Sequence, residues 1–546
     1  MDNQRLFLFI ALSFIALMLW EAWQRDYSAP EPVTQEAEAP GRAATTAPAA
    51  DLPAAPAAPR TQSSDAEAGL ASVGRVRVVT DVFDIEIDTQ GGDLRRADLL
   101  QYPKESNAPE TPVRLLDDQL PNLFIIQSGL RTQTGTEPTH HVVFEAAQSE
   151  YRLAVGQDVL EVPLIWRSPQ GVQVTKRYRF RPGSYVIELE QEVTNASGAD
   201  WAGHQYRQLQ RTEGTTERDN RFIYTYLGGV IYSPEEKYEK IDFSDMSKAP
   251  LARDITNGWA AMIQHYFVGA LIPETGQPNH YYSRALDGDR YVLGMVAPTV
   301  QVANGATERF STRLFVGPKL QDALSEVAPG LELTVDYGVL TVLAKPIFWL
   351  LEKIHDLVGN WGWSIILLTI LIKLAFYKLS ETSYRSMAQM RKLAPRLQGL
   401  KERYGDDRQK LNQAMMDIYR TEKINPLGGC LPIVIQIPVF IALYWVLLES
   451  VEMRQAPFIL WLTDLSDKDP YYVLPLIMGV TMFIQQKLNP APLDPMQAKV
   501  MMVLPFVFTI FFAFFPSGLV LYWVTNNVLS IAQQWVITKR VEQGTK

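Results

Sequence analysis

The chain has 546 residues, a formal net charge of −9 and a single cysteine, Cys430. This length allows several domains. One cysteine excludes an intrachain disulfide and a cysteine-based zinc site. Residues up to about 340 are polar and strand-like, whereas residues 345–540 hold nearly all of the long apolar runs. We therefore expect two parts of different character.

The N-terminal segment, residues 1–25, contains a 15-residue apolar run and is expected to be a transmembrane anchor. Bulky Trp20 and Trp23 occupy the place where a small-residue cleavage site would follow a signal peptide, so we predict that it is not cleaved. Residues 26–68 are then expected to be a tether. The stretch 29–60 has 12 Ala and 7 Pro among 32 residues, which leaves too few large apolar side chains to form a core.

Residues 69–335 are expected to form one large all-β domain. Apolar and charged residues alternate from about residue 75, for example at Val76 and Val78. Segments 173–180 and 185–193 flank the turn sequence Arg-Pro-Gly-Ser and predict a hairpin. Short strands with turn signals continue to about residue 330, which is typical of an antiparallel β-sandwich.

Residues 345–359 are predicted to form an amphipathic helix. Pro346 opens the segment, and its apolar residues fall on one helical face: Ile347, Leu350, Leu351, Ile354 and Val358. The segment is too short to span a bilayer, so we expect it to lie on the outer membrane surface. The alternative is a last helix that packs on the β domain.

A membrane core is expected at residues 360–540. Its five predicted spans lie near residues 364–379, 431–448, 471–486, 500–515 and 518–537. The last two come from one run that is too long for a single span, and Pro516-Ser517-Gly518 divides it. With the anchor, the chain has six predicted spans.

Lys373 lies inside the first core span and is the most deeply placed charge in any predicted span. A charge near the middle of a membrane helix costs roughly 2.5–3.5 kcal/mol on insertion scales, which favours a functional role. The alternative is that its side chain extends to the interface near Lys378.

Loop charges predict the orientation. Residues 378–423 carry 11 Lys/Arg and 6 Asp/Glu, whereas residues 449–470 carry 2 and 5. The positive-inside rule then places the 380–425 loop, the short tail at 541–546 and both termini in the cytoplasm. The region between the first two spans must lie outside.

The 380–425 loop is predicted to be a helical hairpin in which Gly405 ends the first helix and Asp406 caps the second. Its apolar residues recur at three- and four-residue steps and include Met387, Met390, Met415 and Met416. This stripe is most simply the seam between the helices. The alternative is an adaptable surface for apolar partners, and the basic outer face suits anionic lipid or ribosomal RNA.

Four motifs from the membrane part resemble the YidC family of membrane protein insertases: EKINPLGGCLPIVIQIPVFIALYWVLL, VEMRQAPFILWLTDLSDKDP, YYVLPLIMGVTM and FPSGLVLYWVTNN. The resemblance runs from about residue 345 to residue 540. The anchor, tether and β domain resemble the Gram-negative form, whose periplasmic domain is a β-supersandwich. The expected fold is therefore an α-helical membrane core with an all-β periplasmic domain and a cytoplasmic helical hairpin.

The resemblance implies an inner-membrane insertase and chaperone, not an enzyme, with a hydrophilic groove that is closed on the outside. By motif, the groove's positive charge falls on Lys373, where most relatives have arginine, and its polar groups fall on Thr369, Gln436 and Asn526. A lone amide in a span is otherwise a contact between helices. Tyr522 and Trp523 match substrate-contacting aromatic residues, with simple packing or lipid contact as the alternative.

The partners implied are nascent membrane proteins, the Sec translocon, membrane lipids and, weakly or transiently, the ribosome. No small-molecule cofactor and no metal is expected. His140 and His141 adjoin on a predicted strand, where neighbouring side chains point to opposite faces, so they do not predict a metal site. Two other classes remain open: a secondary transporter that uses Lys373, and a membrane-anchored carbohydrate-binding protein whose β domain is the active part.

Overall fold

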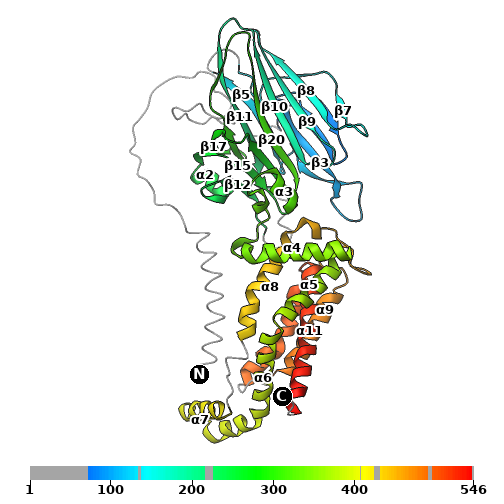
Figure 1. Ribbon diagram of the computed structural model, residues 1–546, viewed down its shortest axis with the longest axis vertical. Coiled ribbons are helices and arrows are strands. Elements are labelled where there is room, and N and C mark those ends of the chain that lie inside the picture. Colours follow the sequence, from blue (N-terminus) through cyan, green and yellow to red (C-terminus); the bar gives the residue numbers. More distant parts are fainter. Residues whose placement is uncertain are drawn as a thin grey trace, which may run out of the picture.

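The computed structural model of this protein describes residues 70, 72–132, 137–214, 225–405, 407–422, 431–489 and 495–543. The predicted anchor at 1–25 and tether at 26–68 lie outside these residues. Figure 1 shows an elongated molecule with a β domain at one end, a helical part at the other and the helix α4 lying across the junction.

Two large sheets make up the β domain. The first runs in the order β14 (Ala252–Thr256), β17 (Pro278–Leu286), β18 (Arg290–Val296), β11 (Trp201–Thr212), β5 (Phe124–Thr132), β3 (Asp93–Pro103), β2 (Phe83–Asp88), β1 (Arg75–Val79) and β7 (Glu150–Arg152), with β19 (Val300–Val302) on β11 and β4 (Pro112–Leu116) on β3. The second runs in the order β13 (Lys237–Ile241), β12 (Gly228–Ser233), β15 (Trp259–Ile263), β16 (Phe267–Pro273), β20 (Thr307–Pro318), β10 (Val186–Asn195), β9 (Val172–Phe180), β8 (Leu160–Arg167) and β6 (Glu145–Ala146). The expectation of a large all-β domain is confirmed.

The predicted hairpin is the antiparallel pair β9 and β10, in which Val174 lies opposite Val193. Gly183 in its turn has a φ of 66°, a left-handed conformation that glycine adopts without steric cost. One pair departs from the antiparallel prediction, because β1 and β7 run parallel.

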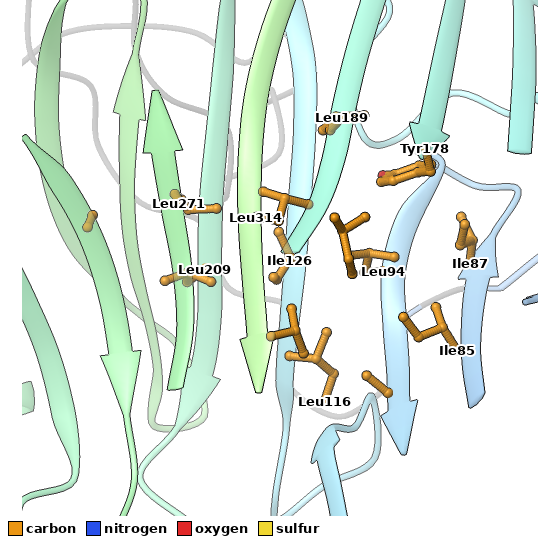
Figure 2. Close-up of a cluster of buried hydrophobic side chains, with 14 of the residues drawn as sticks. Ile85, Ile87, Leu94, Leu116, Ile126, Tyr178, Leu189, Leu209, Leu271 and Leu314 are labelled. Carbon is orange, nitrogen blue, oxygen red and sulfur yellow. The ribbon is translucent and has the colours of Figure 1, made fainter. Parts of the chain in front are cut away.

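The core of the β domain lies between the sheets. Alternate residues of each strand point inward, so Ile85 and Ile87 of β2 meet Leu94 of β3 and Tyr178 of β9 (Figure 2). This is the two-residue period that the sequence showed, now buried on one face.

The helical elements follow the β domain, apart from α2 (Phe243–Lys248), which lies within it. In chain order they are α3 (Gln321–Val327), η1 (Leu331–Thr334), η2 (Gly338–Leu340), α4 (Thr341–Val358), α5 (Trp361–Ala375), α6 (Tyr377–Tyr404), α7 (Arg408–Thr421), α8 (Leu431–Glu449), η4 (Val451–Met453), α9 (Val473–Leu488), α10 (Pro495–Phe512) and α11 (Ser517–Glu542). Helix α11 packs against α9, α5 and α6, and α10 packs against α9.

Within the described residues, no single helix has both the length and the hydropathy needed to cross a bilayer. Helices α5 and α6 meet the requirement as a pair, with a bend of 69° between them. The predicted continuous span at 364–379 is thus interrupted, because α5 ends at Ala375 and α6 begins at Tyr377. Shorter apolar helices occupy Ile435–Glu449, Val473–Leu488 and Ala498–Phe512.

Helix α4 is longer than the predicted segment 345–359. It begins at Thr341, directly after η2, so Pro346 lies inside it instead of opening it. Its main neighbours are α5 and α8, and its buried residues Phe348 and Leu351 belong to an apolar cluster that also includes residues of the β domain. Other apolar residues, such as Val342 and Leu357, are exposed.

The α6–α7 hairpin differs from its prediction at the turn. The cap of α7 is Asp407, whose carboxylate accepts a hydrogen bond from the Lys410 amide at 3.1 Å, because α7 begins at Arg408. The predicted cap, Asp406, lies outside the described residues. Gly405 does follow the last residue of α6, although with a right-handed φ of −52°.

Candidate functional site

Lys373 lies in the last turn of α5, and its side chain points to a neighbouring helix. Its Nζ donates a hydrogen bond to Ser530 Oγ of α11 at 2.8 Å. The Ser530 hydroxyl in turn donates to the Asn526 carbonyl at 2.7 Å. Lys373 is partly buried, and these acceptors replace part of the hydration that its ammonium group loses there.

Further polar side chains surround the bend between α5 and α6. Gln436 of α8 donates to Ser380 Oγ of α6 at 3.4 Å, and Gln533 of α11 donates to the Tyr377 carbonyl at 3.3 Å. Ser380 is buried. We call Lys373, Ser380, Gln436, Ser530 and Gln533 the polar cluster; it joins four helices, α5, α6, α8 and α11.

The polar cluster lies where the packing of the helices loosens. We call the half of each helix nearer to α4 and the β domain the outer half, and the other half the inner half (Figure 1). In the outer half of α8, Leu443 and Val446 are fully buried. In its inner half, Ile435 and Ile437 are 40% and 44% exposed.

The same gradient holds in α5, α9 and α11. In α5, Ile365 and Leu368 are buried, whereas Leu374 one to two turns later is 62% exposed. In α9 the last buried residue is Thr481, although Leu476 and Val480 on another face are both 60% exposed. In α11, residues 517–522 are all buried, whereas later residues are buried only at intervals. The outer halves of the helices form one continuous apolar cluster with residues of the β domain. The helices are therefore closed together on the outer side and open towards the inner side.

Thr369 and Asn526 lie near Lys373 without contributing a side-chain contact to the polar cluster. The buried Thr369 hydroxyl donates to the Ile365 carbonyl of its own helix at 2.6 Å. Asn526 contributes its carbonyl to Ser530, and the buried amide in this part of α11 is the next residue, Asn527, which donates to Thr481 Oγ1 of α9 at 3.3 Å.

The sequence interpretation missed the polar face of α11. Asn527, Ser530 and Gln534 are buried there, and Gln534 donates to Asn489 Oδ1 at 2.9 Å. Their spacing of three and four residues marks one helical face, so a polar-residue count along this span would have found them.

Tyr522 and Trp523 form part of the contact between α11 and α8. Tyr522 is buried and its ring stacks on Phe440 with centroids 5.8 Å apart, and Trp523 meets the same ring edge-on at 4.6 Å. Trp523 also contacts Phe512 of α10. This geometry favours the alternative that Tyr522 has a packing role between the helices. Trp523 is partly exposed.

The four methionines of the hairpin divide into two groups. Met390 and Met415 pack against buried Leu393 and Leu397 in the seam of the hairpin. Met416 is 49% exposed, and Met387 is partly buried outside that seam.

The described residues contain no group of three or more His, Cys, Asp or Glu side chains that could hold a metal ion. The prediction that His140 and His141 lie on a strand with their side chains on opposite faces is wrong. Both lie in a turn, and their rings are 4.2 Å apart. His140 Nδ1 and Tyr206 Oη are 2.5 Å apart, so this ring belongs to the hydrogen bonding of the β domain.

Comparisons with known proteins identify the class of this chain, which is an inner-membrane protein with a large periplasmic domain. Residues 75–350 match the family model described as the YidC periplasmic domain, and residues 353–544 match that of the 60Kd inner membrane protein. The chain belongs to the YidC family.

Two relatives named membrane protein insertase YidC match nearly end to end. The one from Methylococcus capsulatus is 54% identical, covering 100% of this chain and 99% of its own length. The one from Alkalilimnicola ehrlichii is 55% identical, covering 99% and 96%. A solved structure of an active YidC insertase with its first transmembrane domain resolved covers 85% of this chain and 92% of its own, at 17% identity and a TM-score of 0.38.

Proposed function

We propose that this membrane protein insertase receives the polar end of a client in the polar cluster and releases the client's apolar helix sideways to the lipid. The insertase function itself follows from family membership and from relatives of about 50% identity over the whole chain. It needs no catalysed covalent step and no cofactor. The observation that carries the mechanism is the change from closed outer halves to open inner halves, with Lys373 at the boundary.

The proposed topology has six spans with both termini in the cytoplasm. Helices α5, α8, α9, α10 and α11 are the core spans, and α4 lies on the periplasmic surface of the bilayer with Val342 and Leu357 towards lipid. Loop charges support it, because residues 378–423 carry 11 Lys/Arg against 6 Asp/Glu, and residues 449–470 carry 2 against 5. The α6–α7 hairpin is then cytoplasmic.

The charge of Lys373 attracts an incoming polar or acidic segment. An ammonium group has three donors, and Ser530 accepts from one of them. The surrounding hydroxyls and amides offer the segment both donors and acceptors, so it exchanges hydrogen bonds with water for hydrogen bonds with the polar cluster. Trp523 and Asn526, which are partly exposed, extend this path along α11, whereas buried Thr369 and Tyr522 support it through packing.

The energy for insertion comes from the client and the membrane. The sequence contains no G-x-x-x-x-G-K-[ST] motif. Burial of the client's apolar helix in lipid is favourable, and the membrane potential contributes about 2.3 kcal/mol per charge per 100 mV for an acidic segment moving outward.

Partners beyond the client follow from surface charge and from the family. The basic hairpin α6–α7 is the proposed contact for anionic lipid and, transiently, for the ribosome, with exposed Met416 as an apolar contact. Cooperation with the Sec translocon is proposed from the resemblance.

Site-specific photocrosslinking tests the path. A photoreactive residue replaces exposed Ile437 in the inner half of α8 or, as the matched control, exposed Trp349 of α4. Ribosome-bound clients of increasing length are then presented to membranes. We expect crosslinks from Ile437 as soon as the client's apolar segment emerges. Equal or earlier crosslinking from Trp349 would contradict the proposed path.

A further inference from the structure

The hydroxyl group of Ser530 connects three helices at the polar cluster. Lys373 Nζ of α5 donates to Ser530 Oγ at 2.8 Å, and Ser530 donates to the Asn526 carbonyl of its own helix at 2.7 Å. The Tyr384 hydroxyl of α6 is a third hydrogen-bonding partner of Ser530. Helix α11 packs against both α5 and α6, so these contacts lie where three helices meet.

The bond to Asn526 fixes the orientation of the Ser530 hydroxyl. A serine hydroxyl has one hydrogen to donate and two lone pairs that accept. Its hydrogen points to the Asn526 carbonyl one turn earlier, so only the lone pairs remain for the neighbouring helices. One lone pair accepts from Lys373 and the other serves Tyr384. Every hydrogen-bonding position of this hydroxyl is therefore occupied.

Burial separates the serine from the lysine. Ser530 is 2% exposed, whereas Lys373 is only partly buried. A client segment in the polar cluster can therefore reach the ammonium group but not the serine hydroxyl. The bond to Ser530 uses one of the three ammonium donors, so Lys373 is able to bind a client while it stays on Ser530.

Helix α11 also holds the other side of the bend between α5 and α6. Gln533, one turn after Ser530, donates to the Tyr377 carbonyl at 3.3 Å. Lys373 lies before the 69° bend, and Tyr377 is the first residue of α6 after it. Ser530 and Gln533 thus contact the chain on both sides of the bend, and they fix the place from which the Lys373 side chain extends.

The flexible stem of lysine has another position available. Near the end of a membrane helix, a lysine side chain can extend to the aqueous interface. Holding the ammonium group on α11 instead costs side-chain entropy, which a charge-assisted hydrogen bond offsets. The Ser530 hydroxyl is the acceptor that favours the position in the polar cluster.

We infer that Ser530 is a positioning residue for Lys373: its hydroxyl holds the ammonium group in the polar cluster, where an acidic segment of a client meets it. Ser530 acts through Lys373 and does not touch the client. The inference rests on the proposed function, since this position matters only if the charge of Lys373 acts on the client.

Hydroxyl variants of the full-length protein test this role. Ser530→Ala removes the acceptor, and Ser530→Thr keeps it. Thr525→Ala is the matched control, because the Thr525 hydroxyl of the same helix also donates to a carbonyl one turn earlier, that of Leu521, at 2.8 Å. Each variant is made with Lys373 and with Lys373→Ala. Insertion into membrane vesicles is measured for a single-span client with a short acidic outer segment and for the same client with that segment neutralised.

We expect Ser530→Ala to lower insertion of the acidic client about threefold to tenfold, because one hydrogen bond to a charged group is lost. Ser530→Thr should restore insertion, and Thr525→Ala should insert like the parent. In the Lys373→Ala background, Ser530→Ala should cause less than about a twofold further loss, because the group that it positions is gone. The neutral client should likewise lose less than about twofold.

The outcomes separate the inference from the proposed function. If Ser530→Ala inserts the acidic client normally while Lys373→Ala does not, the positioning role is wrong and the proposed function stands. Equal losses from Ser530→Ala with and without Lys373, or for both clients, would show a packing role only and would overturn the inference. Normal insertion by Lys373→Ala would instead contradict the proposed function itself.

Discussion

Glu452, at the junction between the β domain and the helical part, allows a specific prediction of how the stability of the protein depends on pH. It lies in η4, directly after α8, and burial raises the pKa of its carboxyl group from 4.5 to about 7. Glu352 and Asp322 add to this effect as nearby negative charges. Within the described residues, its Oε2 has no hydrogen-bond partner.

The sign of the pH effect follows from proton binding. The folded protein keeps the Glu452 proton up to about pH 7, whereas the unfolded chain releases it near pH 4.5. Between these values the folded state binds more protons, so its stability falls as the pH rises. At about 1.4 kcal/mol per unit, the loss reaches about 3 kcal/mol above pH 7.

Glu452→Gln removes this titration and keeps the shape of the side chain. We expect the variant to match the parent near pH 4.5 and to be up to about 3 kcal/mol more stable at pH 8. Thermal unfolding of the purified full-length protein across this range measures the difference, with exposed Glu326→Gln as the control. A variant that is no more stable than the parent at pH 8 would refute the reasoning.

Other packing predictions use thermal unfolding and proteolysis. A Cβ at Gly362 of α5 would lie 2.0 Å from the Phe458 ring, so Gly362→Ala should cost about 1–3 kcal/mol. Gly399 of α6 has open space around it, so Gly399→Ala should instead gain about 0.5–1 kcal/mol, and the same sign for both would contradict this. Leu397→Ala removes a buried side chain from the hairpin seam and should make the α6–α7 hairpin more sensitive to limited proteolysis, at a cost of about 2 kcal/mol or more; unchanged cleavage would be against it.

The sequence predicted the elements whose signal is local. The β9–β10 hairpin follows from alternation around Arg-Pro-Gly-Ser, and the two-part division follows from the distribution of apolar residues. Both depend on neighbours in the chain, which a sequence shows directly.

Contacts between distant residues could not be predicted in this way. Lys373 and Ser530 are 157 positions apart, and their pairing depends on how α5 and α11 are rotated against each other. The pairing of Lys319 with Glu449 likewise requires the β domain to dock on α8. Helix ends also shifted by small amounts, as at Asp407, because capping depends on the backbone geometry of one residue.

The central claim is that the positive charge at the polar cluster acts on the client. Lys373→Arg, Lys373→Ala and, as the control, Lys378→Ala are compared for insertion of a single-span client with a short acidic outer segment. Lys378 is 91% exposed and lies outside the polar cluster. We expect arginine to preserve insertion, alanine at 373 to lower it about tenfold or more through the lost charge-assisted hydrogen bonds, and the control to insert normally. Normal insertion by Lys373→Ala, or an equal defect in Lys378→Ala, would contradict the account.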